Sequence, residues 1–344
     1  MNRKILSVLT LLLLMLNAVT VSMAGDTPGK ARKQIDPLVM RLPASDAVAV
    51  IDARRFFDEA IPKLLSSQQQ LLAKINGHLA EFQTKTGIDA RKFDKLVVGA
   101  NIKREAVKDF DVDFVVLARG SMNSGSLIAG AKLGSNAGYR EEKIAGHTVY
   151  IFTPKTVVDK NTQSDAAKAA AAKVPAELAV VALDATTLAV GSPARVRDTI
   201  EPKGSISPEL TGLLTTRANP IFAFAARMPD GVRNLLPMDN DELGKNIDSI
   251  RFLSGWADIA AGSAVMNLTA KTAAPENADG LYSTADFLRN FGKGLLGSSK
   301  KPENAVYARL LENAKLSKNG TDVALDLTIA QSDVDMLLSM LNKK

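Results

Sequence analysis

The residues best placed to do chemistry lie where a predicted strand turns into a predicted helix. The segment AVGSPARVRD, which begins at Ala189, carries a Gly-Ser-Pro turn with Arg195 and Arg197 just behind it. A helix N-terminus offers free N–H groups and a positive dipole end, so an anion could bind there. A phosphate cradle needs several glycines, however, and the turn contains Gly191 alone. We therefore interpret Ser192 as a helix cap, whose hydroxyl accepts a hydrogen bond from a free N–H group.

Two acidic runs contain the residue types of a cation site. In the first, Asp109, Asp111 and Asp113 alternate with apolar residues and so share one face of an extended segment. A solvated strand face is the favoured interpretation, and a cation site is the alternative. The second run, DNDELG from Asp239, begins like a calcium loop, but Leu243 stands at the fifth position, where an oxygen ligand is required. The sequence therefore predicts no metal site.

Catalytic side chains are equally sparse. The chain has no cysteine, and its two histidines, His78 and His147, lie on different predicted elements. A histidine base or a multi-histidine metal site would need partners at defined distances. The segment GKGLLGSSK has the glycine spacing of a P-loop, but Ser298 stands where lysine is required. The sequence thus predicts no catalytic residues and no cofactor, and a Ser-Lys hydrolase at Ser298–Lys301 is the least favoured alternative.

The N-terminus has the layout of a secretory signal peptide. Arg3 and Lys4 precede the apolar run Ile5–Leu16, and small residues lead up to Ala24. An apolar run of about a dozen residues is short for the ~30 Å hydrocarbon core of a membrane. We expect residues 1–24 to be removed, so that the mature protein is periplasmic or extracellular. An uncleaved anchor is the alternative.

Charge and hydropathy exclude further classes of function. The formal net charge of the 344-residue chain is +6, and the basic residues are scattered among acidic ones. A nucleic-acid-binding protein would show a basic patch interleaved with aromatic residues. The sequence shows none, so we expect no nucleic-acid partner. Because no second long apolar run follows the signal segment, we also expect no transmembrane segment after cleavage.

The first structural unit is predicted over residues 42–205, after a flexible arm at 25–41. It opens with the β-prone run Ala47–Ile51 and continues with a long helix, which Pro62 should kink or divide. Two strands, a short helix and a hairpin that turns at Gly146 follow. A second hairpin and a helix complete the unit.

A second unit is predicted over residues 218–344, after a linker at 206–217. Its strand–helix opening at Asn219–Leu236 repeats that of the first unit, and a hairpin that turns at Gly320 echoes the Gly146 hairpin. Because the strands meet in hairpins, we expect antiparallel sheets. The predicted fold class is α+β, with two diverged tandem repeats, each an antiparallel sheet with helices packed on one face.

An apolar stripe runs along the long predicted helix of the first unit. Its members recur at spacings of three, four and seven residues and so share one helix face: Leu65, Leu72, Ile75, Leu79 and Phe82. Such a stripe usually covers a sheet, and that is the favoured interpretation. The alternative is that these residues form a ligand or partner surface.

Three short motifs carry a resemblance to known sequences. They are LPASDAVAVID at Leu42–Asp52, GHTVYIF at Gly146–Phe152 and ALDATTLAVGSPARV at Ala182–Val196. In these the chain resembles a loosely defined group of exported bacterial proteins of unknown function, with the pattern LPxxDxVxVxD, GxxVYxF and ALDxxxLxVGS. The resemblance implies a fold and a compartment, and it brings no active-site residues with it.

These observations favour an exported, non-enzymatic binding or scaffold protein, whose partner is a protein or an apolar ligand. A carrier that holds an apolar molecule between a helix and its sheet is the first alternative, and a hydrolase with an unrecognised site is the second. A large apolar cavity under Leu72–Phe82 would favour the carrier. A closed pocket with convergent polar groups of shifted pKa would favour the enzyme.

Overall fold

The computed structural model describes residues 35–106, 109–121, 123–134, 138–153, 176–231, 241–299 and 302–341. The predicted signal peptide 1–24 lies outside the described residues. So do residues 25–34 of the predicted arm, Asp239, and Lys301 of the Ser-Lys alternative.

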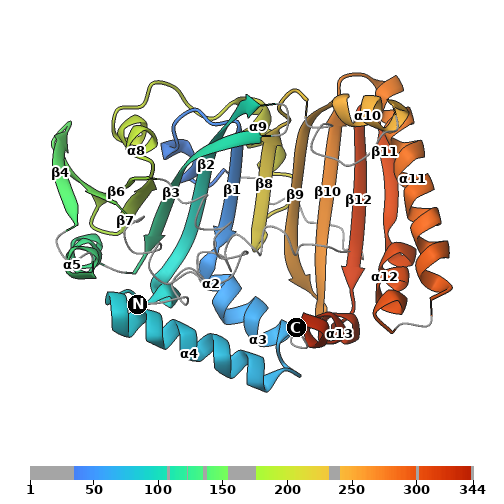
Figure 1. Cartoon of the computed structure of the whole chain (residues 1–344), viewed down its shortest axis with the longest axis horizontal. Coiled ribbons are helices and arrows are strands. Elements are labelled where there is room, and N and C mark those ends of the chain that lie inside the picture. Colours follow the sequence, from blue (N-terminus) through green and yellow to red (C-terminus); the bar gives the residue numbers. More distant parts are fainter. Residues whose placement is uncertain are drawn as a thin grey trace.

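The described strands form one antiparallel sheet, which runs the length of the molecule (Figure 1). Its order is β11-β12-β10-β9-β8-β1-β2-β3-β7-β6-β5-β4. The bounds of the twelve strands are β1 (Ala47–Asp52), β2 (Phe93–Ala106), β3 (Asp109–Gly120), β4 (Tyr139–Ile144), β5 (His147–Phe152), β6 (Leu178–Asp184), β7 (Thr187–Gly191), β8 (Phe222–Arg227), β9 (Ile250–Ala260), β10 (Ser263–Thr272), β11 (Lys315–Asn319) and β12 (Asp322–Ile329). The prediction of an α+β fold with antiparallel strands is confirmed.

The prediction of a separate sheet for each unit is wrong. The opening strands of the two predicted units, β1 and β8, pair with each other, and Ala49 lies opposite Phe224 in their register. Each of these strands would otherwise present an unpaired edge, and pairing satisfies the backbone groups of both. The two units therefore share a single sheet, with β1 and β8 at its middle.

The order of strands on either side of this middle pair also corrects the predicted match of hairpins. Outward from β1 the strands are β2, β3, β7, β6, β5 and β4, and outward from β8 they are β9, β10, β12 and β11. The β11–β12 hairpin, which turns at Gly320, thus occupies the position of the β6–β7 hairpin. It does not correspond to the Gly146 hairpin β4–β5, which extends the sheet beyond β6.

Helices cover parts of both faces of the sheet, so the prediction of helices on one face is wrong. On one face, Val196 of α8 and Leu210 of α9 belong to the same buried cluster as Ala189 and Ala225 of the sheet. On the other face, α12 and α13 pack on Leu327 and its neighbours. The α-helices are α2 (Ala53–Arg55), α3 (Ile61–Leu64), α4 (Gln69–Thr86), α5 (Ser124–Gly134), α8 (Pro193–Ile200), α9 (Pro208–Leu214), α10 (Asp241–Asp248), α11 (Pro275–Gly297), α12 (Pro302–Asn313) and α13 (Gln331–Leu341).

The larger core lies under α8 and α9, on what we call the packed face of the sheet. This face is defined by Val48, Val97, Val115, Leu117 and Ala225, which are cross-strand neighbours or share a strand with them. Two segments that the sequence predicts as an arm and a linker contribute to the core. They supply Leu38, Val39, Ile206 and Leu210, so residues 35–41 and 206–217 are packed parts of the fold.

The predicted long helix is divided, but the break lies at residues 65–68, and Pro62 itself stands within the helical run that ends at Leu64. A helical run begins after Asp52, whose carboxylate accepts a hydrogen bond from the backbone N–H of Arg55 (3.0 Å). It passes through a π-helical turn at Phe56–Ala60 and ends with α3. The missing N–H of a proline is one cause of such irregular turns. A second helix, α4, then runs to Gly87, whose φ of 71° suits a glycine at a helix C-terminus.

Candidate functional site

The second face of the central strands is apolar over three successive rows of residues. Alternation along each strand places every other residue on this face. Its middle row runs across β3, β2, β1, β8 and β9 through Val116, Val98, Ala49, Phe224 and Gly255, each opposite the next. One row above runs from Phe114 to Leu253 and one below from Ala118 to Ala257, and every side chain in both is apolar. We call these three rows the apolar floor.

Burial separates the apolar floor from the packed face of the same strands. On the packed face Val97, Val115, Leu117 and Ala225 are 0% exposed. On the floor, the side chains of the middle row from Val116 to Phe224 are half-buried. Leu268 of β10 continues this row and is 40% exposed. Helices and loops therefore seal one face of the central strands and leave the other incompletely covered.

Helices border the apolar floor at its two ends across the sheet. At one end, α5 packs through Leu127 and Ile128 on Leu188 of β7, which lies opposite Ala118 of the floor. At the other end, α12 and α13 pack on Leu327 and Ile329 of β12. In Figure 1, α5 lies at the left end of the sheet and α12 and α13 lie at the right end, with the middle strands between them.

A third border is α4, which lies along one end of the strands in Figure 1. The chain just before α4 is attached to α13, because Ser67 Oγ donates to Asp335 Oδ1 (2.5 Å) and Gln331 Nε2 donates to the carbonyl of Leu64 (3.0 Å). At its other end α4 contacts α5. It thus spans the distance between the two groups of helices that border the floor.

The predicted surface residues fall beside the apolar floor. Leu65 is buried at the break between α3 and α4 and does not belong to the helical stripe. Leu72, Ile75, Leu79 and Phe82 lie on α4 and are half-buried.

Sequence reasoning missed the floor itself, although a signal for it exists. The runs AVAVI of β1, FAFAA of β8 and FVVLA of β3 are apolar at consecutive positions. Such runs make both faces of a strand apolar, whereas a strand with one solvated face alternates.

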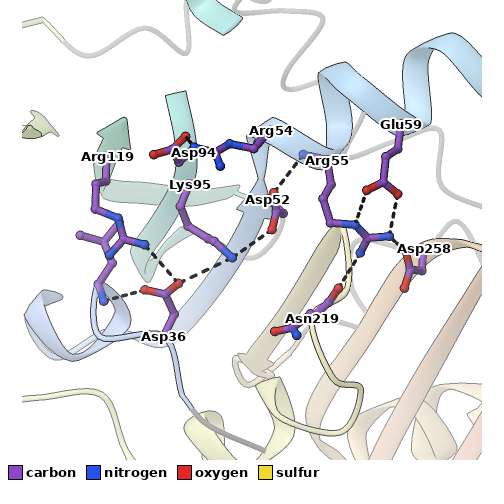
Figure 2. A network of polar contacts seen from close by, with 11 residues as sticks. Asp36, Asp52, Arg54, Arg55, Glu59, Asp94, Lys95, Arg119, Asn219 and Asp258 are labelled. Carbon is purple, nitrogen blue, oxygen red and sulfur yellow. Dashed lines mark hydrogen bonds and ion pairs between the residues drawn. The ribbon is translucent and has the colours of Figure 1, made fainter. Parts of the chain in front are cut away.

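A network of charges closes one end of the packed face (Figure 2). Asp36 lies between Lys95 Nζ (3.6 Å) and Arg119 Nη2 (3.7 Å), and Lys95 also contacts Asp52 Oδ2 (3.2 Å). Beside them Arg54 pairs with Asp94. Each of these charges has an opposite charge beside it, as is usual for a network that holds elements together.

The same network joins the two halves of the sheet. Arg55 of α2 contacts Asp258 of β9 (2.9 Å), and it donates to the carbonyl of Asn219 (2.6 Å). It also makes two hydrogen bonds of 3.1 Å with Glu59. These bonds lower the pKa of Glu59 below its ordinary value. Asp258 has a second cation nearby in Arg217 (3.6 Å). The arrangement supports a structural role, because each charge faces a protein partner.

The Gly-Ser-Pro turn proves to be a helix cap, as predicted. Ser192 Oγ accepts a hydrogen bond from the backbone N–H of Arg195 (3.2 Å). The guanidinium of Arg195 is buried and donates to the carbonyl of Ala44 (2.8 Å) and to Ser45 Oγ (2.5 Å). Burial lowers the pKa of Arg195. Arg197 pairs with Glu142 (3.2 Å). Both arginines therefore contact protein groups, and this supports the helix-cap interpretation over the anion-site interpretation.

The histidines and the acidic run do not assemble a reactive site. His78 lies on α4, 3.8 Å from Glu81, whereas His147 Nδ1 lies 3.1 Å from the carbonyl of Ala182. Asp111 and Asp113 lie on β3 and pair in register with β2, which confirms the strand interpretation. Within the described residues no group of three or more His, Asp or Glu side chains could hold a metal ion.

A small pocket of about 380 Å³ lies between α5 and the start of β5, and Lys132, His147 and Tyr150 line part of it. The ammonium of Lys132 lies 4.2 Å from the ring centre of Tyr150 and 2.9 Å from Glu141 Oε1. Its hydrogen bond with Glu141 raises the pKa of Lys132 above its ordinary value. This pocket is not the large apolar cavity under Leu72–Phe82 that the carrier hypothesis envisaged.

No helix among the described residues is both long and apolar enough to cross a membrane. The scan against protein-family models finds no match, and neither does the search of curated proteins. Three crystal forms of the protein TP0453 match the structure at 12% sequence identity. Form IV has a TM-score of 0.43 and covers 91% of this chain and 100% of that chain. Form III has a TM-score of 0.42, with 90% and 100% covered, and form I has 0.40, with 90% and 98% covered. TM-scores below 0.5 establish nothing about what this chain binds.

Proposed function

We propose that this protein is an exported, non-enzymatic binding protein and that the apolar floor holds its ligand. The observation that carries the proposal is the contrast between the two faces of β1, β2, β3 and β8. One face is sealed, and the other presents half-buried apolar side chains between the bordering helices α4, α5, α12 and α13. Contiguous apolar surface of this kind is typical of an interaction site. This proposal joins the predicted binding role to the carrier alternative.

The chemistry of the floor supports an apolar ligand. None of the side chains in its three rows can donate or accept a hydrogen bond. A sugar or a peptide laid on this surface would lose its hydrogen bonds to water without replacement, at a cost of about 1–3 kcal/mol per group. A hydrocarbon ligand has no such groups to desolvate and gains about 25 cal/mol for each Å² that it buries. A carrier of an apolar molecule fits this surface better than a protein scaffold does.

Export forms part of the proposal through the predicted signal peptide at 1–24. We propose that the mature protein is periplasmic or extracellular and begins near Gly25. A carrier of apolar molecules has a physical purpose in an aqueous compartment, because hydrocarbon transfers poorly through water.

We also propose that the sheet arose from two diverged tandem repeats. Two series of strands run outward from the middle pair, and in both the chain forms the first three strands in order and then the fifth strand before the fourth along the chain. The series are β1, β2, β3, β7, β6 and β8, β9, β10, β12, β11. On this proposal the β4–β5 hairpin is an addition to the first repeat. The likeness is limited to the strands, because α8 after β7 and α13 after β12 pack on opposite faces of the sheet. Superposing the two strand series tests the proposal, and a mismatch in strand direction or spacing would contradict it.

The binding proposal is tested by filling the floor. Ala49 is the middle residue of the middle row, and Ala49→Trp would place a large apolar side chain where the ligand lies. The probe is an uncharged N-phenyl-naphthylamine dye, whose fluorescence rises in apolar surroundings. The matched control is Ala324→Trp, because Ala324 is also half-buried but lies opposite Thr269 on the other face of the sheet.

We expect the wild type and Ala324→Trp to bind the dye and Ala49→Trp to bind it at least tenfold more weakly, with similar melting temperatures for all three. Equal binding by the two variants would contradict the location of the site. A folded wild-type protein that binds no dye would contradict the function.

A further inference from the structure

We propose that the ligand of the apolar floor is an anionic long-chain amphiphile, whose acyl chain lies on the floor and whose charged group binds Arg251. This inference rests on the proposed function and narrows its ligand to one chemical class. It depends on three features: the apolar side chains of the three rows, the dimensions of the floor, and the cation Arg251 at its end, whose guanidinium has no partner among the residues that the structure describes.

The dimensions of the floor fit an acyl chain. Strands in a sheet lie about 4.8 Å apart, so the five strands from β3 to β9 span roughly 19 Å. The hydrocarbon core of a bilayer is about 30 Å thick and holds two layers of chains, so one lipid chain reaches roughly 15 Å. One extended chain therefore fits across the strands between α5 and the α12–α13 pair.

The composition of the middle row also favours a linear chain. Ala49 and Gly255 are its smallest residues, and they alternate with Val98 and Phe224 across the strands. The Gly255 position is already tight, because a Cβ there would lie 2.8 Å from the ring of Phe224. Small and large residues thus alternate along the row and make its surface uneven, and a flexible chain can adapt its conformation to such a surface.

Arg251 supplies a charge at the end of the floor. It lies on β9 two residues before Leu253. The pairing of β9 with β10 is irregular at this point, but the register with β8 continues, because the backbone N–H of Met228 donates to the carbonyl of Arg251 (2.9 Å); this register places Arg251 on the same face as the floor. It is exposed, and its guanidinium makes no hydrogen bond or ion pair with the described residues. Arg55, Arg195 and Arg289, in contrast, are each bonded to protein groups.

The chemistry of guanidinium defines the partner. Its planar N–H groups match the two oxygens of a carboxylate or a phosphate, and it stays charged at any physiological pH. Arg251 lies at the end of the strands away from α4. The row of the floor that contains Ala47 and Leu253 is next to Arg251, and the row that contains Ile51 and Ala257 is at the opposite end. At that opposite end β1 leads into α2, α3 and then α4. A bound amphiphile would thus have its chain among apolar residues and its anion beside Arg251.

The test displaces the bound dye with chains that differ in their end group. Palmitate carries a carboxylate, hexadecanol has the same chain length without a charge, and phosphatidylglycerol presents a phosphate. Arg251→Gln removes the charge at the floor. Lys203→Gln is the matched control, because Lys203 is 81% exposed and lies after α8, on the packed side.

For the wild type and Lys203→Gln we expect palmitate or phosphatidylglycerol to displace the dye at concentrations about tenfold lower than hexadecanol does. Arg251→Gln should abolish this difference and leave the affinity for hexadecanol unchanged. Which of the two anions is the stronger competitor distinguishes a fatty acid carrier from a phospholipid carrier.

Two outcomes would overturn the inference and leave the proposed function standing. If hexadecanol competes as well as palmitate and Arg251→Gln changes nothing, the anionic end group is wrong. If the dye binds and Ala49→Trp blocks it, but none of the three chains displaces it, the acyl class is wrong. Failure of the dye itself to bind the wild type would contradict the function on which the inference rests.

Discussion

At the scale of single residues, Ser192 shows how a turn that suits an anion can serve a structural purpose. Its hydroxyl caps α8, and the arginines that follow it contact protein groups. Ser192→Ala should lower the free energy of unfolding by about 1 kcal/mol, because an N–H at the helix end loses its acceptor. Ser192→Asp should retain the wild-type stability, because the carboxylate accepts the same bond beside the positive dipole end.

Thermal melts of the three proteins, with and without phosphate at constant ionic strength, measure this. A stabilising effect of phosphate on the wild type that disappears in Ser192→Asp would contradict the cap as the whole role of the turn.

The contacts of Asp184 predict how the stability of the protein depends on pH. Burial opposes its ionisation, but bonds from Arg41 and from Thr186 outweigh burial, and they lower the pKa from 3.8 to about 2. Because this carboxyl binds its proton more weakly in the folded chain than in the unfolded one, its contribution is complete above about pH 4. It is lost as the pH falls from 4 towards 2.

Denaturant melts of the wild type and Asp184→Asn at several pH values test this. We expect the wild type to be the more stable protein at pH 6 and the difference to shrink between pH 4 and 2. A difference that does not change with pH would contradict the assigned bonds. Arg41→Gln should reproduce the loss of the pH-dependent part.

At the scale of elements, substitution of two glycines by alanine should have opposite effects on stability, because one glycine is required by close packing of strands and the other lies in an open helix position. A Cβ on Gly191 of β7 would lie 2.3 Å from the carbonyl oxygen of Phe114 on β3, and this backbone cannot move aside. Gly191→Ala should therefore destabilise the protein by about 1–3 kcal/mol. Gly212 lies within α9 with nothing near its missing Cβ. Gly212→Ala should stabilise the protein by up to about 1 kcal/mol, since alanine is the better helix former.

Chemical denaturation of the two variants measures both changes. Equal effects of the two substitutions would mean that the close approach of β7 to β3 is not a constraint on the sheet.

At the scale of the whole molecule, the shared sheet predicts cooperative unfolding. The main core contains Val48 from the first unit and Ala223 and Ala225 from the second, and β1 pairs with β8. The contact of Arg55 with Asp258 adds a third link between the halves. We expect a single calorimetric transition, whose van't Hoff and calorimetric enthalpies agree. Two separated transitions would show that the halves unfold independently.

The sequence by itself determined those features that neighbouring residues encode. Apolar runs placed the strands, the Gly-Ser-Pro turn predicted the cap of α8, and Pro62 predicted that the long helix would not be regular, although the break itself follows Leu64. These predictions succeed because strand period, helix caps and proline geometry are properties of short segments. The absence of cysteine and the presence of only two histidines are facts of the sequence, whatever the fold.

Tertiary structure alone decided which edges pair and which faces are covered. Ala49 and Phe224 lie opposite each other although 175 positions separate them along the chain, so no local pattern reveals their pairing. The runs in β1 and β8 indicate that both faces of these strands are apolar. They do not indicate which face receives α8, α9 and residues 35–41. That choice depends on where distant segments find room to pack, and it is what leaves the apolar floor incompletely covered.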